Sequence, residues 1–169
     1  MARALVILFA LGTAACVSSG AVPRPFPSPG TPAASPGAAP AARPAASRDG
    51  YSIAGTALSF RGAPYRNGGA DPAGFDCSGF VHYVLARHGI AVGRTVSEQY
   101  RAGHSVEAAR LEPGDLVFFN TSGTGPSHVG VAIGGDEFVH APSSTGEVRV
   151  ERLGSSYWAG RFVGARSFK

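Results

Sequence analysis

Residues 75–89 read FDCSGFVHYVLARHG, and this stretch decides how the folded part of the chain is built. Asp76 stands where a helix N-cap is expected, and Gly89 suits the C-terminal end of the same helix. Between them, apolar residues recur at helical spacing and form one broad face: Phe80, Val81, Val84, Leu85 and His88. The pattern therefore predicts a helix with Cys77 in its first turn. There the unpaired backbone N–H groups and the positive end of the helix dipole favour a thiolate.

Cys77 is one of only two cysteines in the chain. The other, Cys16, lies far upstream in a different kind of sequence, so we expect no structural disulfide between them. A buried, inert cysteine is the usual alternative for a lone thiol. Here the small and polar residues of DCSG, and the glycine-rich loop before them, favour a functional position. From these residues alone, a catalytic thiol and an inert one remain equally open.

The first 16 residues have the pattern of an export signal. After a positively charged start, residues 4–15 form an apolar run shorter than the roughly 20 residues needed to span a bilayer. The run ends TAAC, which resembles a bacterial lipobox, although Thr13 stands where such boxes usually carry leucine. We therefore predict that Cys16 is lipidated and anchors an exported protein to a membrane, facing the periplasm or cell wall. A plain signal peptide cut near Ala15 is the alternative.

Residues 17–48 have the composition of a linker. They are dominated by Pro, Ala, Ser and Gly without apolar periodicity, so they cannot bury enough surface to offset the entropy of ordering. Their prolines favour extended conformations of about 3 Å per residue, which would hold the next domain away from a membrane. Because Val17 is not acidic, we expect the anchor to be in the outer membrane if the host has one. Residues 49–169 then form a single domain of ordinary size.

The charge of the chain argues against one class of partner. The formal net charge is +4 and no run of Lys or Arg appears, so we expect no nucleic-acid site. A mild positive charge is compatible with an anionic surface such as a bacterial wall or lipid headgroups. We expect the chain to act as a monomer.

Within residues 49–169, the sequence changes from helical to strand-like patterns. YSIAGTALSFRG has apolar residues at helical spacing up to Gly62, and the loop APYRNGGADPAG separates it from the helix at Cys77. After Glu112, five short β-rich runs follow, separated by turn residues: DLVFF, HVGVAIG, EFVHA, VRVERL and FVGARSF. Helices followed by strands predict an α+β fold, with N-terminal helices packed on an antiparallel sheet of about five or six strands.

Two histidines lie on neighbouring predicted strands. His128 opens HVGVAIG and His140 closes EFVHA, with GGDE at the turn between them. A loop of three or five residues would place both on one side of the sheet, whereas a two-residue loop would place them on opposite sides. On one side, one imidazole can take the proton of a thiol while the second orients it. A zinc site using Cys77 and the two histidines is the competing interpretation, but no CxxC, HxH or HExxH spacing supports it.

Taken together, five blocks resemble the NlpC-type bacterial cell-wall cysteine peptidases in order and spacing. The blocks are GAPYRNGG, FDCSGFV, RTVSEQY, LEPGDLVFF and SHVGVAIGGDEFVHA, and the resemblance covers about residues 51–169. It implies a papain-like α+β fold and an enzyme that hydrolyses peptide bonds in peptidoglycan stem peptides or cross-links. By position, Cys77 resembles the nucleophile of the family, His128 the base and His140 the orienting residue.

The resemblance also implies roles for three further residues. Tyr65 matches a tyrosine whose hydroxyl lies near the nucleophile, and Asp76 and Ser78 match positions that line the substrate pocket. No metal or organic cofactor is required by such an enzyme. An amidase or acyltransferase on the same scaffold, and a wall-binding lipoprotein without catalysis, are the alternative functions.

Overall fold

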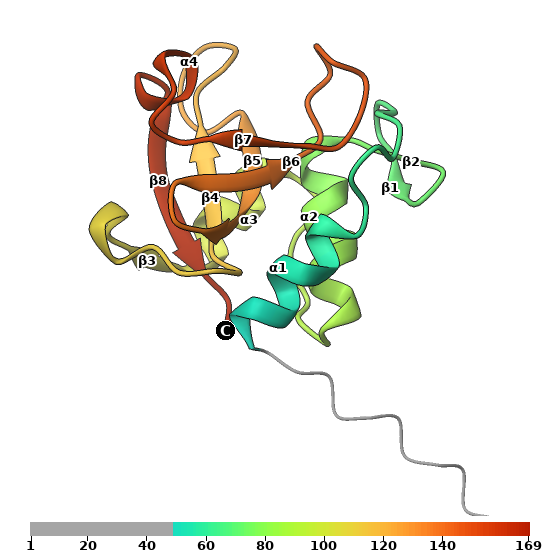
Figure 1. Ribbon diagram of the computed structural model, residues 1–169, viewed down its shortest axis with the longest axis horizontal. Coiled ribbons are helices and arrows are strands. Elements are labelled where there is room, and N and C mark those ends of the chain that lie inside the picture. The colour runs from blue at the N-terminus through green and yellow to red at the C-terminus, as the bar shows by residue number, and fades with distance from the viewer. Residues whose placement is uncertain (1–48) are drawn as a thin grey trace, which may run out of the picture. The chain divides into compact units, whose positions relative to one another are not determined.

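The computed structural model describes residues 49–169 (Figure 1). The predicted signal peptide, the lipidation of Cys16 and the linker 17–48 therefore lie outside the described residues. In the described part, helices α1 (Gly50–Leu58) and α2 (Cys77–Arg87) pack together on one side of a six-stranded sheet. No helix among these residues is long and apolar enough to cross a membrane.

All strand pairs in the large sheet are antiparallel. The strand order is β3-β8-β4-β5-β6-β7, and a separate two-stranded hairpin, β1 (Ala70–Asp71) with β2 (Gly74–Phe75), precedes α2. The six strands are β3 (His104–Val106), β4 (Leu116–Phe119), β5 (His128–Gly134), β6 (Glu137–His140), β7 (Arg149–Arg152) and β8 (Phe162–Ser167). The five predicted β-rich runs thus each form a strand, and the expected α+β architecture is confirmed.

Helix α2 begins and ends as its sequence predicts. The Asp76 side chain accepts a hydrogen bond of 2.7 Å from the backbone N–H of Gly79, which caps the helix. At the other end Gly89 has φ +70°, a left-handed conformation that a side chain would oppose. The apolar face between these ends is buried against α1 and the sheet.

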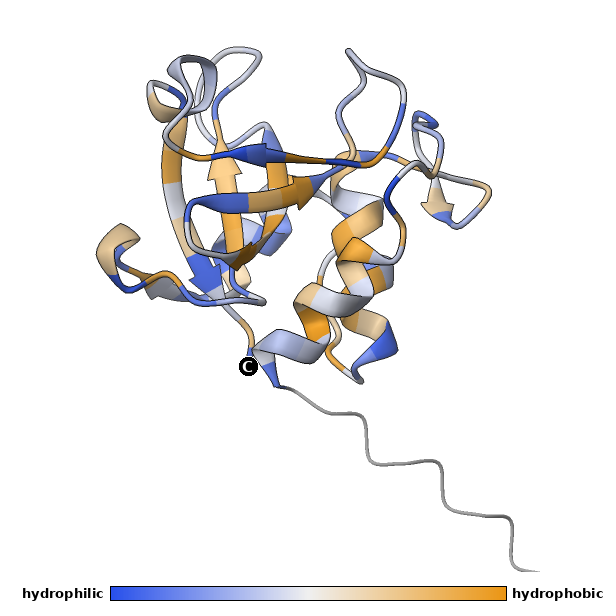
Figure 2. Cartoon of the chain, viewed as in Figure 1, coloured by the Kyte–Doolittle hydropathy of each residue, from blue (hydrophilic) through white to orange (hydrophobic). Residues whose placement is uncertain are grey.

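The sheet separates two apolar clusters because alternate residues of each strand point to opposite faces. On the helix side, Leu116, Phe118, Val129, Val131 and Val139 pack against α1 and α2. On the other side, Val117, Phe119, Ala132, Phe138, Trp158 and Ala165 form a second cluster under α4 (Ser156–Ala159). Figure 2 shows apolar stretches along the central strands and along α2. The sheet is therefore buried on both faces at its centre.

A β-bulge interrupts the pairing of β5 with β6. Ala132 pairs with Phe138, but the next pair is Gly134 with Glu137, so the register shifts by one residue. Only residues 135 and 136 remain in the turn. Gly134 has φ +113° and Gly135 has φ +58°, and glycine adopts such angles without a steric penalty. The Gly-Gly sequence therefore permits both the bulge and the tight turn.

Helix α3 (Val96–Ala102) was not predicted from the sequence, although its first residues belong to the RTVSEQY block. Thr95 and Glu98 form a capping box, each side chain bonding to the backbone N–H of the other. Helix α3 follows Arg94, a residue that reaches the N-terminus of α2.

Candidate active site

The thiol of Cys77 lies in the first turn of α2, next to the start of β5. The backbone N–H groups of Ser78, Val129 and Cys77 itself lie near the sulfur and act to lower the thiol pKa. Burial of the sulfur and the nearby carboxylate of Asp76 outweigh them, so the pKa of the Cys77 thiol is raised. The helix position led us to expect a lowered thiol pKa, and the direction here is the opposite. The helix dipole is opposed by desolvation and by an adjacent negative charge.

His128 and His140 lie on the same side of the sheet and are joined directly. The His128 Nε2 and His140 Nδ1 atoms are 2.7 Å apart, and both rings are buried. We expected a two-residue turn to separate the two rings, but the bulge in β5 adds one residue and restores a common side. Gly130 makes room for the pair, because a Cβ there would lie 2.7 Å from Phe138 and 3.1 Å from the Cβ of His140.

Burial keeps the two imidazoles neutral. Desolvation lowers the pKa of His128 to about 4. The pKa of His140 falls to about 2, first through desolvation and then through the positive charges of His128, when protonated, and Arg149. Among residues 49–169, no protein group bonds to the buried Nε2 of His140. The raised pKa of the Cys77 thiol and the lowered pKa of His128 both favour the neutral forms of these two groups at neutral pH.

Trp158 covers the histidine pair. Its ring stacks on His128 with centroids 5.5 Å apart and an interplanar angle of 24°, and it meets His140 edge-on at 5.0 Å and 89°. The indole N–H donates to Glu151, which also pairs with Arg149 at 3.1 Å. The sequence patterns did not predict a role for Trp158. The only feature that distinguishes it in the sequence is that it is the single tryptophan of the chain.

At the N-terminus of α2, Asp76 is held by Arg94. Two hydrogen bonds of 2.6 Å and 2.9 Å join the guanidinium to the carboxylate, and a third of 3.0 Å reaches the Ser78 hydroxyl. Burial acts to raise the pKa of Asp76, but the bonds from Arg94 and from the Gly79 N–H prevail, and the pKa is lowered. The sequence around Arg94 gives no indication of its role, because its partner Asp76 lies 18 residues away.

Tyr65 lies close to this group. Burial first, and then the negative charges that Cys77 and Asp76 can carry, raise the pKa of its hydroxyl. Its backbone pairs with Phe75, directly before the helix. The structure thus brings Tyr65, Asp76, Cys77 and Ser78 together, and places the histidine pair at the strand whose backbone contacts the thiol.

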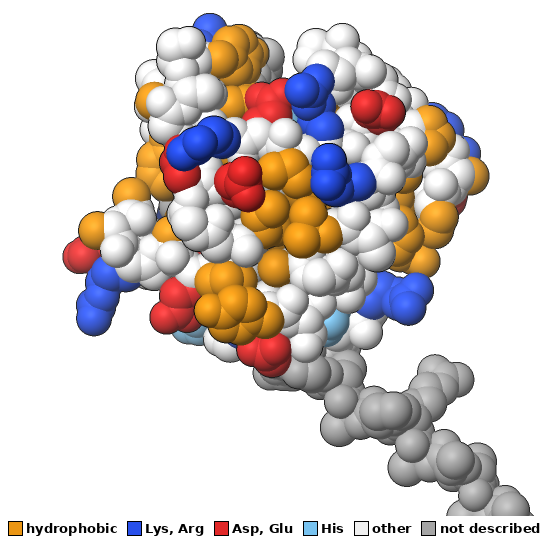
Figure 3. Space-filling model, in the orientation of Figure 1, with side chains coloured by type: hydrophobic (Ala, Val, Ile, Leu, Met, Phe, Trp, Pro, Cys, Tyr) orange, Lys and Arg blue, Asp and Glu red, His pale blue; other side chains and the backbone are white. Residues whose placement is uncertain are grey.

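The remaining polar groups lie elsewhere. His82 bonds to the carbonyl of Val92, His88 bonds to Thr56, and His104 is exposed. Within residues 49–169, no three His, Cys, Asp or Glu side chains are grouped so as to hold a metal ion. On the face drawn in Figure 3, basic and acidic side chains are interspersed around apolar ones.

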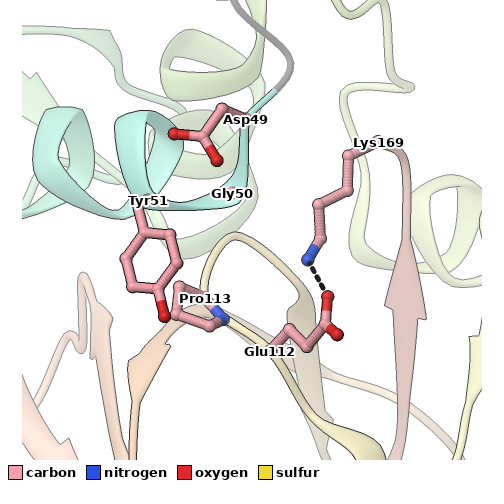
Figure 4. A pocket seen from close by; sticks show the side chains of 6 residues that line it. All are labelled: Asp49, Gly50, Tyr51, Glu112, Pro113 and Lys169. Atoms are coloured by element: carbon pink, nitrogen blue, oxygen red, sulfur yellow. Dashed lines mark hydrogen bonds and ion pairs between the residues drawn. The ribbon is translucent and has the colours of Figure 1, made fainter.

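A cavity of about 470 Å³ lies where the described residues begin and end (Figure 4). It is lined by residues 49–51 together with Glu112, Pro113 and Lys169, and the Lys169 ammonium bonds to Glu112 at 3.0 Å. Because none of the candidate site residues lines it, we assign it no part in the chemistry.

The described architecture, with a cysteine at a helix N-terminus and histidines on an adjoining antiparallel sheet, is the papain-like α+β fold. The chain belongs to the NlpC/P60 family, whose sequence pattern matches residues 62–167. The family expected from the five sequence blocks is therefore confirmed.

Curated relatives are similar over the folded part of the chain. It is 41% identical to the probable peptidoglycan endopeptidase LytE of Bacillus subtilis over 116 residues, which are 69% of this chain and 34% of LytE. It is 43% identical to the murein DD-endopeptidase MepH of Escherichia coli over 112 residues, which are 62% of this chain and 41% of MepH. The chain thus spans well under half of either relative.

Solved structures agree in fold. An NlpC/P60 family protein from Bacillus cereus superposes with a TM-score of 0.67 at 34% identity, covering 71% of this chain and 40% of that one. The NlpC/p60 domain of the peptidoglycan hydrolase SagA superposes with a TM-score of 0.62 at 37% identity, covering 70% of this chain and 98% of the domain.

Proposed function

We propose that this protein is a cell-wall hydrolase that cleaves peptide bonds in peptidoglycan stem peptides or cross-links by a Cys-His-His thiol mechanism. The observation that carries the proposal is the buried contact of 2.7 Å between His128 on β5 and His140 on β6, with the backbone N–H of Val129, the next residue of β5, close to the Cys77 thiol. Relatives that are named peptidoglycan or murein endopeptidases support the substrate class.

In the first step the Cys77 sulfur attacks the carbonyl carbon of the scissile bond while its proton passes to His128. The Nε2 atom of His128 is engaged with His140, so Nδ1 is the atom that accepts this proton. The raised pKa of the thiol and the lowered pKa of His128 imply that the proton moves during attack rather than before it. The carbonyl π electrons move to oxygen, and the backbone N–H of Cys77 stabilises the resulting oxyanion.

In the second step the tetrahedral intermediate collapses to a thioester. The C–N bond breaks, and His128 returns its proton to the leaving amine. Water, deprotonated by the same imidazole, then attacks the thioester carbon, the C–S bond breaks, and the imidazolium returns its proton to the sulfur, which releases the acid and restores the free thiol. His140 accepts a hydrogen bond from His128 Nε2–H and so holds the tautomer in which Nδ1 is free.

The acyl half of the substrate is assigned to the side of Cys77 that carries Tyr65, Asp76 and Ser78. There the Tyr65 hydroxyl binds substrate or the oxyanion. A free amine of a stem peptide would have to share the Asp76 carboxylate with Arg94, which already bonds to both of its oxygens. Recognition on this side therefore involves Arg94 as well as the residues expected from the sequence.

Membrane attachment and reach depend on residues outside the described part, and both are proposals. Cys16 is the expected lipidation site, and the linker 17–48 then gives the domain reach from a membrane. We propose accordingly that the protein acts outside the cytoplasm, facing the periplasm or wall.

Mass spectrometry of purified peptidoglycan after digestion tests the function and identifies the bond. We expect new free amine and carboxyl ends within stem peptides or cross-links for the wild-type protein and none for Cys77→Ala. Cleavage at the junction between glycan and peptide would instead identify an amidase, and peptide ends carrying a new acyl acceptor would identify an acyltransferase. Unchanged peptidoglycan with retained binding would leave the wall-binding alternative.

A further inference from the structure

The acidic side chain of Glu151 lies on β7, the strand at one edge of the large sheet. The steps of the proposed reaction do not use it. In the β6–β7 register Glu151 is opposite Phe138 and Arg149 is opposite His140, so both side chains lie on the face of the sheet that carries the histidine pair. The Glu151 side chain is only 26% exposed. A largely buried carboxylate therefore stands beside the candidate catalytic residues.

Two partners hold this carboxylate. One oxygen, Oε2, accepts the indole N–H of Trp158, and the other, Oε1, pairs with the Arg149 guanidinium at 3.1 Å. Trp158 is 5% exposed, and the N–H is the one polar group of its side chain. Loss of the acceptor would leave a buried donor without a partner. The bond to Glu151 therefore fixes the direction in which the indole N–H points.

Packing alone constrains the ring of Trp158 less strictly. Its apolar neighbours are Phe119 and Phe138, with centroids 4.6 Å and 5.3 Å away at interplanar angles of 57° and 87°. Aromatic contacts are favourable over a range of distances and angles, so they bury the ring without selecting a single orientation. The backbone adds little, since α4 is one turn of four residues. A hydrogen bond, which is directional, adds the constraint that these contacts lack.

The orientation of Trp158 matters because its ring lies on the ring of His128. The two planes are stacked at 24° with centroids 5.5 Å apart. The χ2 torsion of histidine is broad, so the contact of Nε2 with His140 fixes one atom of the imidazole but not its whole plane. The stacked indole fixes that plane, and thereby the direction in which Nδ1 accepts the proton of Cys77.

We propose that Glu151 is a positioning residue for His128 that acts through Trp158: the carboxylate orients the indole, and the indole orients the imidazole. Arg149 assists by orienting the carboxylate. The inference rests on the proposed function, since that reaction makes His128 the proton acceptor and donor. The property required of residue 151 is then a hydrogen-bond acceptor, not a negative charge.

Three substitutions of Glu151 separate these two properties. Glu151→Gln keeps an acceptor for the indole N–H and removes the charge, whereas Glu151→Leu and Glu151→Ala remove both. We expect the leucine and alanine variants to lower kcat about 10-fold or more with KM within about twofold, because displacement of a catalytic group by about 1 Å can cost 100-fold. Glu151→Gln should keep kcat within about threefold of wild type. The assay follows the new peptide ends that the full protein releases from soluble fragments of purified peptidoglycan.

Two further variants complete this series. Glu137→Leu is the matched control, because it exchanges a carboxylate for leucine at an exposed position of the neighbouring strand β6, and it should stay within about twofold of wild type. Trp158→Phe keeps an aromatic ring without an N–H. In the Trp158→Phe background, Glu151→Leu should cause no further loss of kcat, since the two residues act as one unit.

NMR of ¹⁵N-labelled histidine tests the positioning without turnover, in the protein without substrate at pH 7. The nitrogen shifts report which ring nitrogen of His128 carries the proton, and the shifts of its ring protons report the stacked indole. We expect one His128 tautomer, protonated on Nε2, with the same ring-proton shifts in the wild type, Glu151→Gln and Glu137→Leu. Glu151→Leu and Glu151→Ala should lose the shift caused by the indole or show both tautomers.

The two measurements separate the possible failures. If the wild type releases no peptide ends but the His128 signals respond to residue 151 as expected, the proposed reaction is wrong while the positioning stands. The inference is overturned if Glu151→Gln loses as much kcat as Glu151→Leu, or if the losses of Glu151→Leu and Trp158→Phe are additive. Unchanged His128 signals in Glu151→Leu would overturn it whatever the enzyme cleaves.

Discussion

The buried histidine pair should make the stability of this fold depend steeply on pH. His128 has a pKa of about 4 in the folded protein, whereas an unfolded histidine has its ordinary value of 6.5. Because the folded value is lowered, the unfolded chain binds more protons between these two values. The contribution to stability is therefore complete above pH 6.5 and is lost as the pH falls towards 4.

The size of the effect follows from the shift. At pH 5 each unfolded histidine is 1.5 pH units below its pKa, so each residue that stays neutral in the fold loses about 2 kcal/mol of stabilising free energy. His140, with a folded pKa of about 2, loses a similar amount. The pair together accounts for about 4 kcal/mol between pH 7 and 5, a large share of the roughly 5–15 kcal/mol that stabilises a typical domain.

Urea denaturation followed by Trp158 fluorescence measures this dependence at pH 7, 6 and 5. We expect the wild-type free energy of unfolding to fall by about 4 kcal/mol over this range, and that of His140→Gln to fall by about half as much. The other histidines are present in both proteins and cancel in the comparison. The carboxylates with lowered pKa, such as Asp76, act only below about pH 4. A wild-type curve that is flat from pH 7 to 5, or a variant that falls as steeply, would refute the reasoning.

Four further outcomes are expected. Cys77→Ala and Cys77→Ser should abolish peptidoglycan cleavage, and His128→Ala should reduce it about 100-fold or more, in assays of released fragments; a folded Cys77→Ala protein with normal activity would rule out the assignment. His140→Asn or His140→Gln should keep part of the kcat and His140→Ala less, whereas equal losses in all three would argue against an orienting role. In the protein without substrate, iodoacetamide should alkylate Cys77 only at pH values above the ordinary thiol pKa, because burial and Asp76 raise the pKa of this thiol. A fast reaction at pH 7 would contradict this. Cys16→Ser should release the protein from membrane fractions, and soluble wild-type protein with unmodified Cys16 would end the anchor hypothesis.

Local patterns in the sequence predicted the elements of the fold well. Helical spacing before Gly89 and β-rich runs after Glu112 depend on neighbours along the chain, and each became a helix or strand in the structure. The side of the sheet that each histidine faces was not predictable in the same way. It depends on counting residues around one turn, and a bulge changes that count. The signal for the bulge was present in Gly134 and Gly135, which tolerate the left-handed angles that it requires.

Contacts across long sequence separations left no such local signal, and they set the electrostatics of the site. Arg94 neutralises the charge of Asp76, which lies 18 residues before it in the sequence. Trp158 packs against His128, which lies 30 residues before it (158 − 128). The first contact lowers the pKa of a carboxylate whose charge would otherwise act more strongly on the thiol, and the second covers one face of the His128 ring. A helix N-terminus alone would have predicted a thiolate at Cys77. The structure instead balances the dipole against burial and Asp76, so in the mechanism that we propose His128 takes the proton as the bond forms.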